Sequence, residues 1–265
     1  MSELFIGTQG FAFKDWVGPF FPRGMAPSRH LEWYSRQFRT IEINTSFYGV
    51  PRPATVDGWQ RRVPEGFRFA AKFPQEITHE KMLVGCGALT ERFIETMRGL
   101  GDKLGPLLLQ FSYQFDPDHF GDLVRYLEQL PSDLQFAVEV RNRDWYETEI
   151  CDMLKAQGKA LALHDLYYMP RREDVTASFV YIRWLGRRVD LQQFDRIQLD
   201  RRDEEKWWAE RVARFLDQGL SVFGYFNNHW AGHAPASAQG FLKALGQPIE
   251  SIEPLPPEPH QPRLL

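Results

Sequence analysis

Charged side chains end strand-like apolar runs at five places in this chain. The runs are Thr40–Asn44, Phe67–Lys72, Phe136–Arg141, Leu161–Asp165 and Phe179–Arg183, and together they supply carboxylates, an amine, guanidinium groups and an imidazole. Because the carboxyl ends of parallel strands meet at one edge of an α/β protein, these charges are predicted to converge on one rim. Acids, bases and cations gathered at a rim are the groups that proton transfer and anion recognition require.

Strand geometry predicts which of these side chains face the same way. Residues two apart on a strand point to one face, so Glu42 should share a face with Asn44, and Glu139 with Arg141. The isoleucines and valines between them suit burial beneath helices. By the same argument, the residues that face the same interior also include Lys72, Gln110, His164, Tyr181, Arg183 and Asn227.

This inward set predicts an acid–base site, an anion-binding site, or both. Glu42 and Glu139 are the candidate catalytic acid and base, assisted by His164 or Asp165. Cationic side chains outnumber carboxylates in the set, so the expected ligand is a small anionic or phosphorylated molecule or a nucleotide. The candidate ligand-binding residues are Asn44, Tyr48, Lys72, Gln110, Arg141, Trp145, Arg183 and Asn227.

Two structural roles compete with these functional ones. An acidic and a basic residue inside a barrel can simply neutralise each other as an ion pair, although charge buried on five strands would be costly to the fold. Aromatic residues follow several of the strands, among them Phe47, Tyr48 and Trp145. Such rings suit the wall of a binding site for a sugar or a base, and they suit loop packing equally well.

The elements that must position these residues alternate along the chain. Eight apolar runs, the first at Leu4–Ile6 and the last at Val222–Phe226, are separated by amphipathic segments such as Glu204–Asp217. Alternating strands and helices demand a parallel sheet with right-handed crossovers, and eight such units predict a (β/α)8 TIM barrel. An open doubly wound sheet is the alternative, but no GxGxxG follows the first strand. The segment Met169–Ser178 is too short for a helix.

The barrel is predicted as one domain over residues 1–249, with a proline-rich tail at residues 250–265. The chain has 265 residues, 43% hydrophobic and 25% charged, as ordinary globular proteins do. A formal net charge of −3 argues against bulk nucleic-acid binding. Two cysteines without CxxC spacing indicate neither a disulfide framework nor a zinc module. With no secretion signal and no membrane-length apolar run, we expect a cytoplasmic protein, favoured as a monomer.

Ordered motifs at the strand ends resemble one known family. The motifs are Ile6-Gly-Thr-Gln-Gly-Phe11, Thr40-Ile-Glu-Ile-Asn-Thr-Ser-Phe-Tyr48, Phe67-Arg-Phe-Ala-Ala-Lys72, Ala137-Val-Glu-Val-Arg141 and Tyr225-Phe-Asn-Asn228. They resemble the YecE-like family, also called domain of unknown function 72, from about Leu4 to Leu245. The resemblance implies a TIM barrel and no established reaction. Histidines that are frequent in the family are replaced here by Asn142 and Leu185, so ligand-binding charges carry over more firmly than a catalytic histidine.

Several functions remain open from the sequence. The main prediction is anion binding at the rim, with hydrolysis of a phosphoester rather than a glycoside as its chemistry, because strands four and seven end in Gln110 and Arg183 instead of carboxylates. A metal-dependent phosphodiesterase like endonuclease IV is an alternative, although Lys72 and Arg141 would repel a cation unless a phosphate intervened. The other alternative is a module that binds a nucleotide or a nucleic-acid end without turnover. Whether the chain is an enzyme, and which metal or cofactor it holds, stays unassigned.

Overall fold

All eight predicted runs form strands, within a few residues of their predicted bounds. In a computed structural model that describes residues 2–187 and 191–247, every pairing between neighbouring strands is parallel, in the order β1-β8-β7-β6-β5-β4-β3-β2. The strands are β1 Leu4–Thr8, β2 Thr40–Ile43, β3 Arg68–Lys72, β4 Leu104–Gln110, β5 Phe136–Glu139, β6 Ala160–Asp165, β7 Phe179–Trp184 and β8 Ser221–Phe226.

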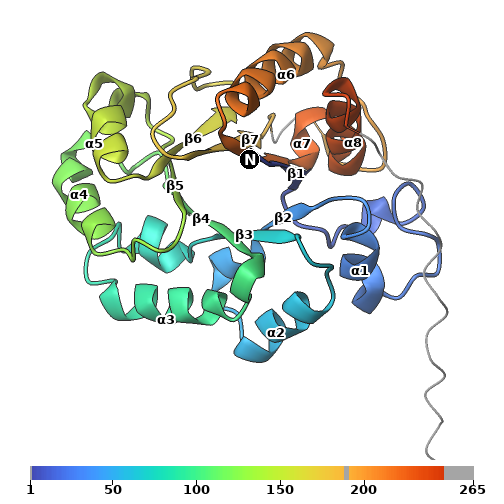
Figure 1. Ribbon diagram of the computed structural model, residues 1–265, viewed down its shortest axis with the longest axis horizontal. Coiled ribbons are helices and arrows are strands. Elements are labelled where there is room, and N and C mark those ends of the chain that lie inside the picture. The colour runs from blue at the N-terminus through green and yellow to red at the C-terminus, as the bar shows by residue number, and fades with distance from the viewer. Residues whose placement is uncertain (1, 188–190, 248–265) are drawn as a thin grey trace, which may run out of the picture.

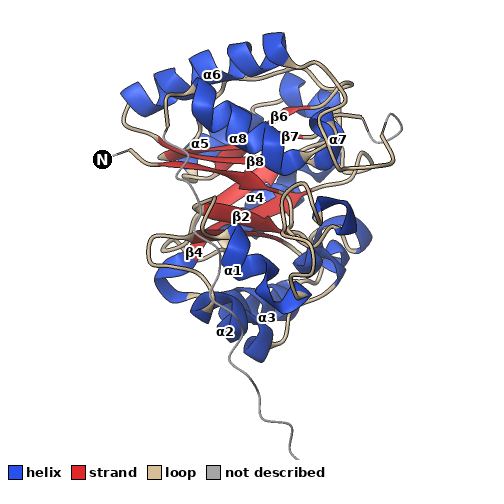
Figure 2. Ribbon diagram, turned by 90° about the vertical axis from the view of Figure 1, so that its right-hand side faces the viewer, coloured by secondary structure: helices blue, strands red, loops and turns tan. Residues whose placement is uncertain are grey.

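Parallel strands oblige the chain to cross back outside the sheet after each strand, and most of these crossovers are helical. The helices are α1 His30–Tyr34, α2 Pro53–Arg61, α3 Gly87–Arg98, α4 Phe120–Glu128, α5 Ile150–Ala156, α6 Arg202–Asp217, α7 Asn228–Ala231 and α8 Ala234–Ala244. They surround the strands in Figure 1, and in the side view of Figure 2 the strands lie between helices above and below. The predicted (β/α)8 barrel is therefore confirmed.

Two features of the helices bear on the predictions. The connection from β6 to β7 over residues 166–178 contains no helix, as its length predicted. The four-residue helix α7 was not predicted, because four residues carry too little periodicity to detect. The predicted tail at residues 250–265 lies outside the described residues, as do residues 1, 188–190, 248 and 249 of the predicted domain. None of the described helices is both long and apolar enough to cross a membrane.

The barrel interior is apolar in its lower part and polar at its upper end. Residues that alternate with the helix-facing ones form a separate buried cluster made of Phe5, Ala70, Leu108, Ala137, Ala160, Ala162, Phe179, Tyr181, Phe223 and Tyr225. Phe5 stacks on Phe223 with 4.7 Å between the ring centroids. One step further toward the carboxyl ends, the inward residues become charged. The apolar layer thus forms a floor beneath the polar mouth of the barrel.

The ring closes between β1 and β2 with the help of a side chain from α1. The hydroxyl of Tyr34 accepts the N–H of Thr8 at 2.9 Å and donates to the carbonyl of Thr40 at 3.0 Å. Beyond it, the N–H of Gly10 donates to the carbonyl of Glu42 at 2.9 Å. Gly7 permits this close approach, because a Cβ on it would lie 2.2 Å from the carbonyl oxygen of Thr40.

Gly7→Ala is therefore expected to lower the free energy of unfolding by about 3 kcal/mol, since neither backbone can move without opening the seam. Urea denaturation followed by circular dichroism measures this. The control is Gly58→Ala in α2, where a Cβ would meet nothing within 4 Å. That substitution should stabilise the protein by roughly 0.5–1 kcal/mol by favouring the helix. Equal stability of the two variants would contradict the role assigned to Gly7.

Candidate functional site

The centre of the barrel mouth is a guanidinium that holds two carboxylates from different strands. Arg183 on β7 donates from Nε and Nη2 to the two oxygens of Glu42 on β2, each at 2.9 Å. Its Nη1 donates to Glu139 on β5 at 2.8 Å. Tyr181 adds its hydroxyl to Glu42 at 2.7 Å. All four side chains are buried, and each charged group among them has an oppositely charged partner in direct contact, as burial requires.

Arg141 lies above this buried group, at its solvent side. Its Nε donates to the second oxygen of Glu139, and its Nη1 lies 3.5 Å from the hydroxyl of Tyr168. The side chain of Arg141 is 17% exposed, whereas that of Glu139 is fully buried. Glu139 therefore fixes the guanidinium at Nε, while Nη1 lies near only the hydroxyl of Tyr168 and the side chain keeps part of its exposure. A planar fork held in this way suits a carboxylate or a phosphate.

Lys72 is the third cation of the mouth and has no carboxylate partner among the described residues. Its Nζ donates to Oε1 of Gln110 at 2.6 Å and lies 3.6 Å from the centroid of the Phe47 ring. Gln110 in turn donates its amide to the carbonyl of Phe111. Lys72 as a whole is 7% exposed, so the side chain is largely desolvated without being paired to an anion.

The charges of the mouth shift one another's pKa values in opposite directions. Burial lowers the pKa of Lys72 to about 7, helped by Arg183 and only partly offset by Glu139 and Glu42. Burial by itself would raise the pKa of Glu139, but Arg141 and Arg183 more than reverse this and hold it well below its usual range. Near neutral pH, Glu139 is therefore ionised, whereas Lys72 exists in both protonation states.

His164 lies buried on β6 beside this group. Its Nε2 is 3.3 Å from the hydroxyl of Tyr146, and its Nδ1 has no side-chain partner among the described residues. Burial lowers the pKa of His164 to about 4, which Glu139 opposes and Arg141 reinforces. The imidazole is thus neutral at physiological pH and is suited to accept a proton only from a strong acid.

The buried imidazole makes a pH-dependent contribution to stability. Because the folded pKa of about 4 lies below the usual 6.5, the unfolded chain binds the proton first as the pH falls. The contribution of His164 is fully present above pH 6.5 and is lost between pH 6.5 and 4, by up to about 3 kcal/mol. His164→Gln should flatten this part of the stability profile in urea titrations. If the stability of His164→Gln falls between pH 6.5 and 4 as much as that of the parent protein, His164 is not the group responsible.

The segment after β3 carries His79 over the mouth. A π-helical turn at Glu76–Glu80 ends in a loop where Met82 and Leu83 adopt φ values of 43° and 75°. Positive φ is strained for residues other than glycine, and π turns and such strain concentrate at functional sites. The His79 ring packs edge-on against Phe47, with 4.9 Å between centroids. Burial, with Lys72 and Arg141 next in importance, lowers the pKa of His79 to about 4.

The structure brings together only part of the predicted site. The side chains it gathers in the mouth are those of Glu42, Lys72, Gln110, Glu139, Arg141, His164 and Arg183. Asn44 is half-buried and begins the 3-10 turn Thr45–Tyr48 at the end of β2. Asn227 lies at the seam, where its amide donates to Gln9 at 2.9 Å.

Two predicted residues are placed away from the mouth. Asp165 follows the inward His164 and so points outward, where it accepts the indole N–H of Trp208 in α6 at 2.8 Å and pairs with Arg171 at 2.8 Å. Trp145 is fully buried, stacks on Phe115 and donates its indole N–H to the carbonyl of Phe115 at 2.6 Å. For Trp145, loop packing was the alternative, and the structure corrects the prediction that it lines the site. Asp165 points away from His164 because successive residues of a strand face opposite sides.

Tyrosines on three rim loops are strongly exposed. Tyr48 follows β2, Tyr113 follows β4 and Tyr167 follows β6, with exposed fractions of 79%, 67% and 66%. Tyr168, which contacts Arg141, escaped the sequence argument because it lies three residues beyond the strand. Only the alternation within a strand carries a signal for facing, and that signal ends where the strand ends.

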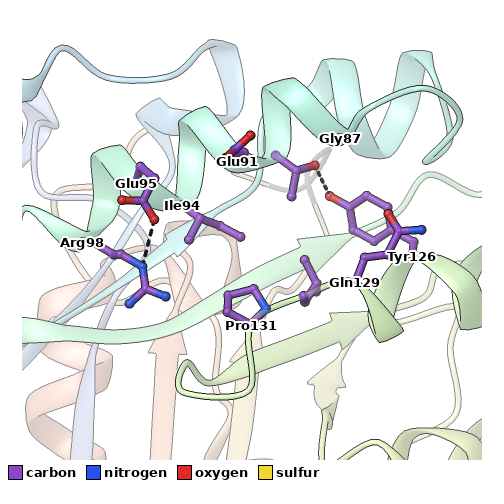
Figure 3. Close-up of a pocket in the computed structure, with 10 residues that line it drawn as sticks. Gly87, Glu91, Ile94, Glu95, Arg98, Tyr126, Gln129 and Pro131 are labelled. Atoms are coloured by element: carbon purple, nitrogen blue, oxygen red, sulfur yellow. Dashed lines mark hydrogen bonds and ion pairs between the residues drawn. The ribbon is translucent and has the colours of Figure 1, made fainter.

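A hollow of about 280 Å³ lies outside the barrel, between α3 and the end of α4 (Figure 3). Its cationic side chain is already paired, because Arg98 contacts Glu95 at 3.1 Å and Asp133 at 2.7 Å. The hydroxyl groups of Tyr126 and Thr90 share a hydrogen bond of 2.5 Å. This hollow therefore lacks the unpaired cationic character of the mouth.

Metal-binding side chains are not grouped in the described parts of the chain: no three or more His, Cys, Asp or Glu side chains converge there as metal ligands would. Glu42 and Glu139 would also have to leave Arg183 before either could bind a cation. The geometry therefore gives the anionic ligand more support than a cation.

Comparisons with known proteins agree with the fold and extend over the whole barrel. The profile of a family described as protein of unknown function DUF72 matches residues 5–263. UPF0759 protein YecE of Escherichia coli K12 is 34% identical over 143 residues, which are 54% of this chain and 50% of YecE. The match thus spans about half the length of that relative. UPF0759 protein YunF of Bacillus subtilis is 22% identical over 95% of this chain and 98% of YunF.

Solved structures of other proteins show the same fold. A DUF72 family protein from Thermotoga maritima superposes with a TM-score of 0.75 and 27% identity, over 92% of this chain and 100% of its own. D-psicose 3-epimerase, at a TM-score of 0.53 and 14% identity over 84% of this chain and 95% of its own, shares the fold alone. With its profile matched from residue 5 to residue 263, this protein belongs to the DUF72 family.

Proposed function

We propose that the carboxyl-end mouth of the barrel binds a small anionic molecule, with Arg141 as the contact to its carboxylate or phosphate. The observation that carries this proposal is that the deeper arginine of the mouth is fully paired with carboxylates, whereas the shallower one is not. Arg183 is paired with two buried carboxylates, whereas Arg141 contacts one carboxylate, through Nε, and its side chain is 17% exposed. Lys72 adds a second cation without a carboxylate partner among the described residues. An anion entering the mouth therefore meets positive charge first.

The geometry supports binding more than the predicted acid–base role of Glu42 and Glu139. Each carboxylate accepts from Arg183, and Glu139 accepts from Arg141 as well. The pKa of Glu139 is held well below its usual range by Arg141 and Arg183, so Glu139 is a weak base and carries no proton to donate. If the site catalyses hydrolysis, proton transfer falls more naturally to Lys72, whose pKa of about 7 lies near neutrality.

The test is thermal denaturation in the presence of inorganic phosphate, pyrophosphate or citrate at constant ionic strength. A ligand that selects the folded form raises the Tm, by a few degrees when present in large excess over its Kd. Arg141→Gln should abolish the shift, while glutamine still offers Glu139 a donor. The control is Arg143→Gln, because Arg143 lies in the same loop but is exposed and bonds to the carbonyl of Tyr168. A shift that survives Arg141→Gln and vanishes with Arg143→Gln would refute the proposal.

The exposed tyrosines favour one second candidate, a nucleotide or nucleic-acid end bound without turnover. Bases stack on aromatic rings with about 1–3 kcal/mol each, and Tyr48, Tyr113 and Tyr167 stand at the rim around the cations. Fluorescence titration with a short 5′-phosphorylated single strand distinguishes this candidate from a small anion. Tyr48→Ser should weaken binding of the oligonucleotide about tenfold while leaving the phosphate-induced shift intact. If Tyr48→Ser changes neither, the small anion remains the better assignment.

A further inference from the structure

We propose that Lys72 forms an imine with the carbonyl group of the bound ligand, so that the mouth takes anionic carbonyl compounds such as oxo acids and aldehyde or ketone phosphates. This proposal rests on the proposed anion-binding function and names the ligand class of the same site. It requires an amine that no carboxylate holds as an ammonium ion, and a nearby anchor for the anionic group. The structure supplies each of these in turn.

The amine of Lys72 ends β3 and projects into the mouth. Its two contacts, Gln110 and the Phe47 ring, are uncharged. The neighbouring carboxylates are held by Arg183 and Arg141 instead, so no ion pair locks the ammonium form. Burial beside cations is the arrangement that keeps a lysine neutral enough to attack a carbonyl. The pKa of Lys72 near 7 agrees with this arrangement.

Arg141 provides the anchor next to the amine. The amine of Lys72 donates to Gln110 on β4, and Gln110 lies opposite Glu139 on β5, the carboxylate that holds Arg141. A carboxylate or phosphate on Arg141 would bring a carbonyl a few bonds away toward Lys72. Positioning of this kind converts a bimolecular reaction into one within a complex. A neutral carbonyl compound has no such anchor.

The reaction balances without an oxidant or a reductant. The lone pair of Nζ forms a bond to the carbonyl carbon, and the carbonyl oxygen takes up the proton lost by the nitrogen. The resulting carbinolamine loses that oxygen as water, which leaves a carbon–nitrogen double bond to Lys72.

The experiment is reductive trapping of the full chain with pyruvate or glycolaldehyde phosphate in the presence of cyanoborohydride, which transfers hydride to the imine and leaves a secondary amine. Intact mass and peptide mapping then locate the adduct. The expected result is one adduct on the peptide that contains Lys72, at least tenfold weaker in Arg141→Gln and tenfold weaker with acetone as the neutral probe. Mapping on the unaltered protein keeps the test valid even if a Lys72 variant folds poorly.

Lys159 is the matched control within the same chain. It too is buried, has a lowered pKa because of burial, and lies 4.6 Å from the centroid of an aromatic ring, that of Phe136. However, it precedes β6, at the end of the barrel opposite Arg141. Labelling of Lys159 as fast as Lys72 would show ordinary amine reactivity and overturn the proposal.

The outcomes separate the imine from anion binding itself. A phosphate-induced rise in Tm without any adduct on Lys72 overturns the imine and leaves anion binding standing. Absence of both the rise and the adduct overturns both proposals. In Lys72→Arg, which keeps a cation at this position but cannot form a stable imine, the adduct on this peptide should disappear.

Discussion

Arg183→Met is expected to lower the free energy of unfolding by about 3–5 kcal/mol, because it leaves two buried carboxylates without their shared partner. Glu42 and Glu139 are both fully buried and receive three of their hydrogen bonds from this one guanidinium. Urea or guanidinium denaturation at pH 7 measures the loss. Acidification should restore part of it, since protonation removes the uncompensated charge.

The control for this prediction is a surface pair of similar length. Arg39 and Glu3 meet at 2.8 Å with side chains that are 56% and 45% exposed, and Arg39→Met should cost less than about 1 kcal/mol. A triple variant with Arg183→Met, Glu42→Gln and Glu139→Gln should recover much of the stability, since it buries no charge. If Arg183→Met costs no more than Arg39→Met, the mouth is wetter than the structure shows and the three charges are solvated independently.

Lys72→Met is expected to act in the opposite direction and to stabilise the protein at pH 7 by about 1–3 kcal/mol. The folded pKa of Lys72, about 7, lies below its usual 10.5. Between these two values the unfolded chain holds a proton that the folded protein releases, so the penalty from Lys72 is complete below about pH 7 and disappears toward pH 10.5. The lost bond to Gln110 offsets part of the gain. The advantage of Lys72→Met should therefore shrink steadily between pH 7 and 10.5.

Denaturation at pH 7 and pH 9.5 tests this, with Lys103→Met as the control. Lys103 is also buried, but it donates to the carbonyls of Gln60 at 2.9 Å and Val63 at 2.7 Å. Removing it leaves two carbonyls unpaired and should destabilise the protein at both pH values. Should Lys72→Met prove the less stable protein at pH 7, Lys72 would be a structural cation rather than a residue kept for function. A residue that lowers the stability of the folded protein is kept at a site for function and not for folding.

The fold places several of the predicted residues where strand alternation puts them. The inward positions of Glu42, Lys72, Glu139, His164 and Arg183 follow from a period of two along each strand. The same period places Asp165 outward, against α6. Trp145 lies in a loop, where no period indicates direction, and its burial against Phe115 is decided by the path of the loop. Whether any of these residues binds a ligand or catalyses a reaction stays a prediction.

The sequence by itself determined the barrel and the identity of the charged residues at its mouth, because strand alternation and the spacing of apolar runs are written in neighbouring residues. Only the tertiary structure decided how those charges pair. Glu42 and Arg183 are 141 positions apart in the chain, and their contact depends on the closure of the whole ring. Desolvation depends in the same way on everything packed around a group. The assignment of Arg183 to the interior, and of Arg141 and Lys72 to the opening, is for that reason a property of the fold.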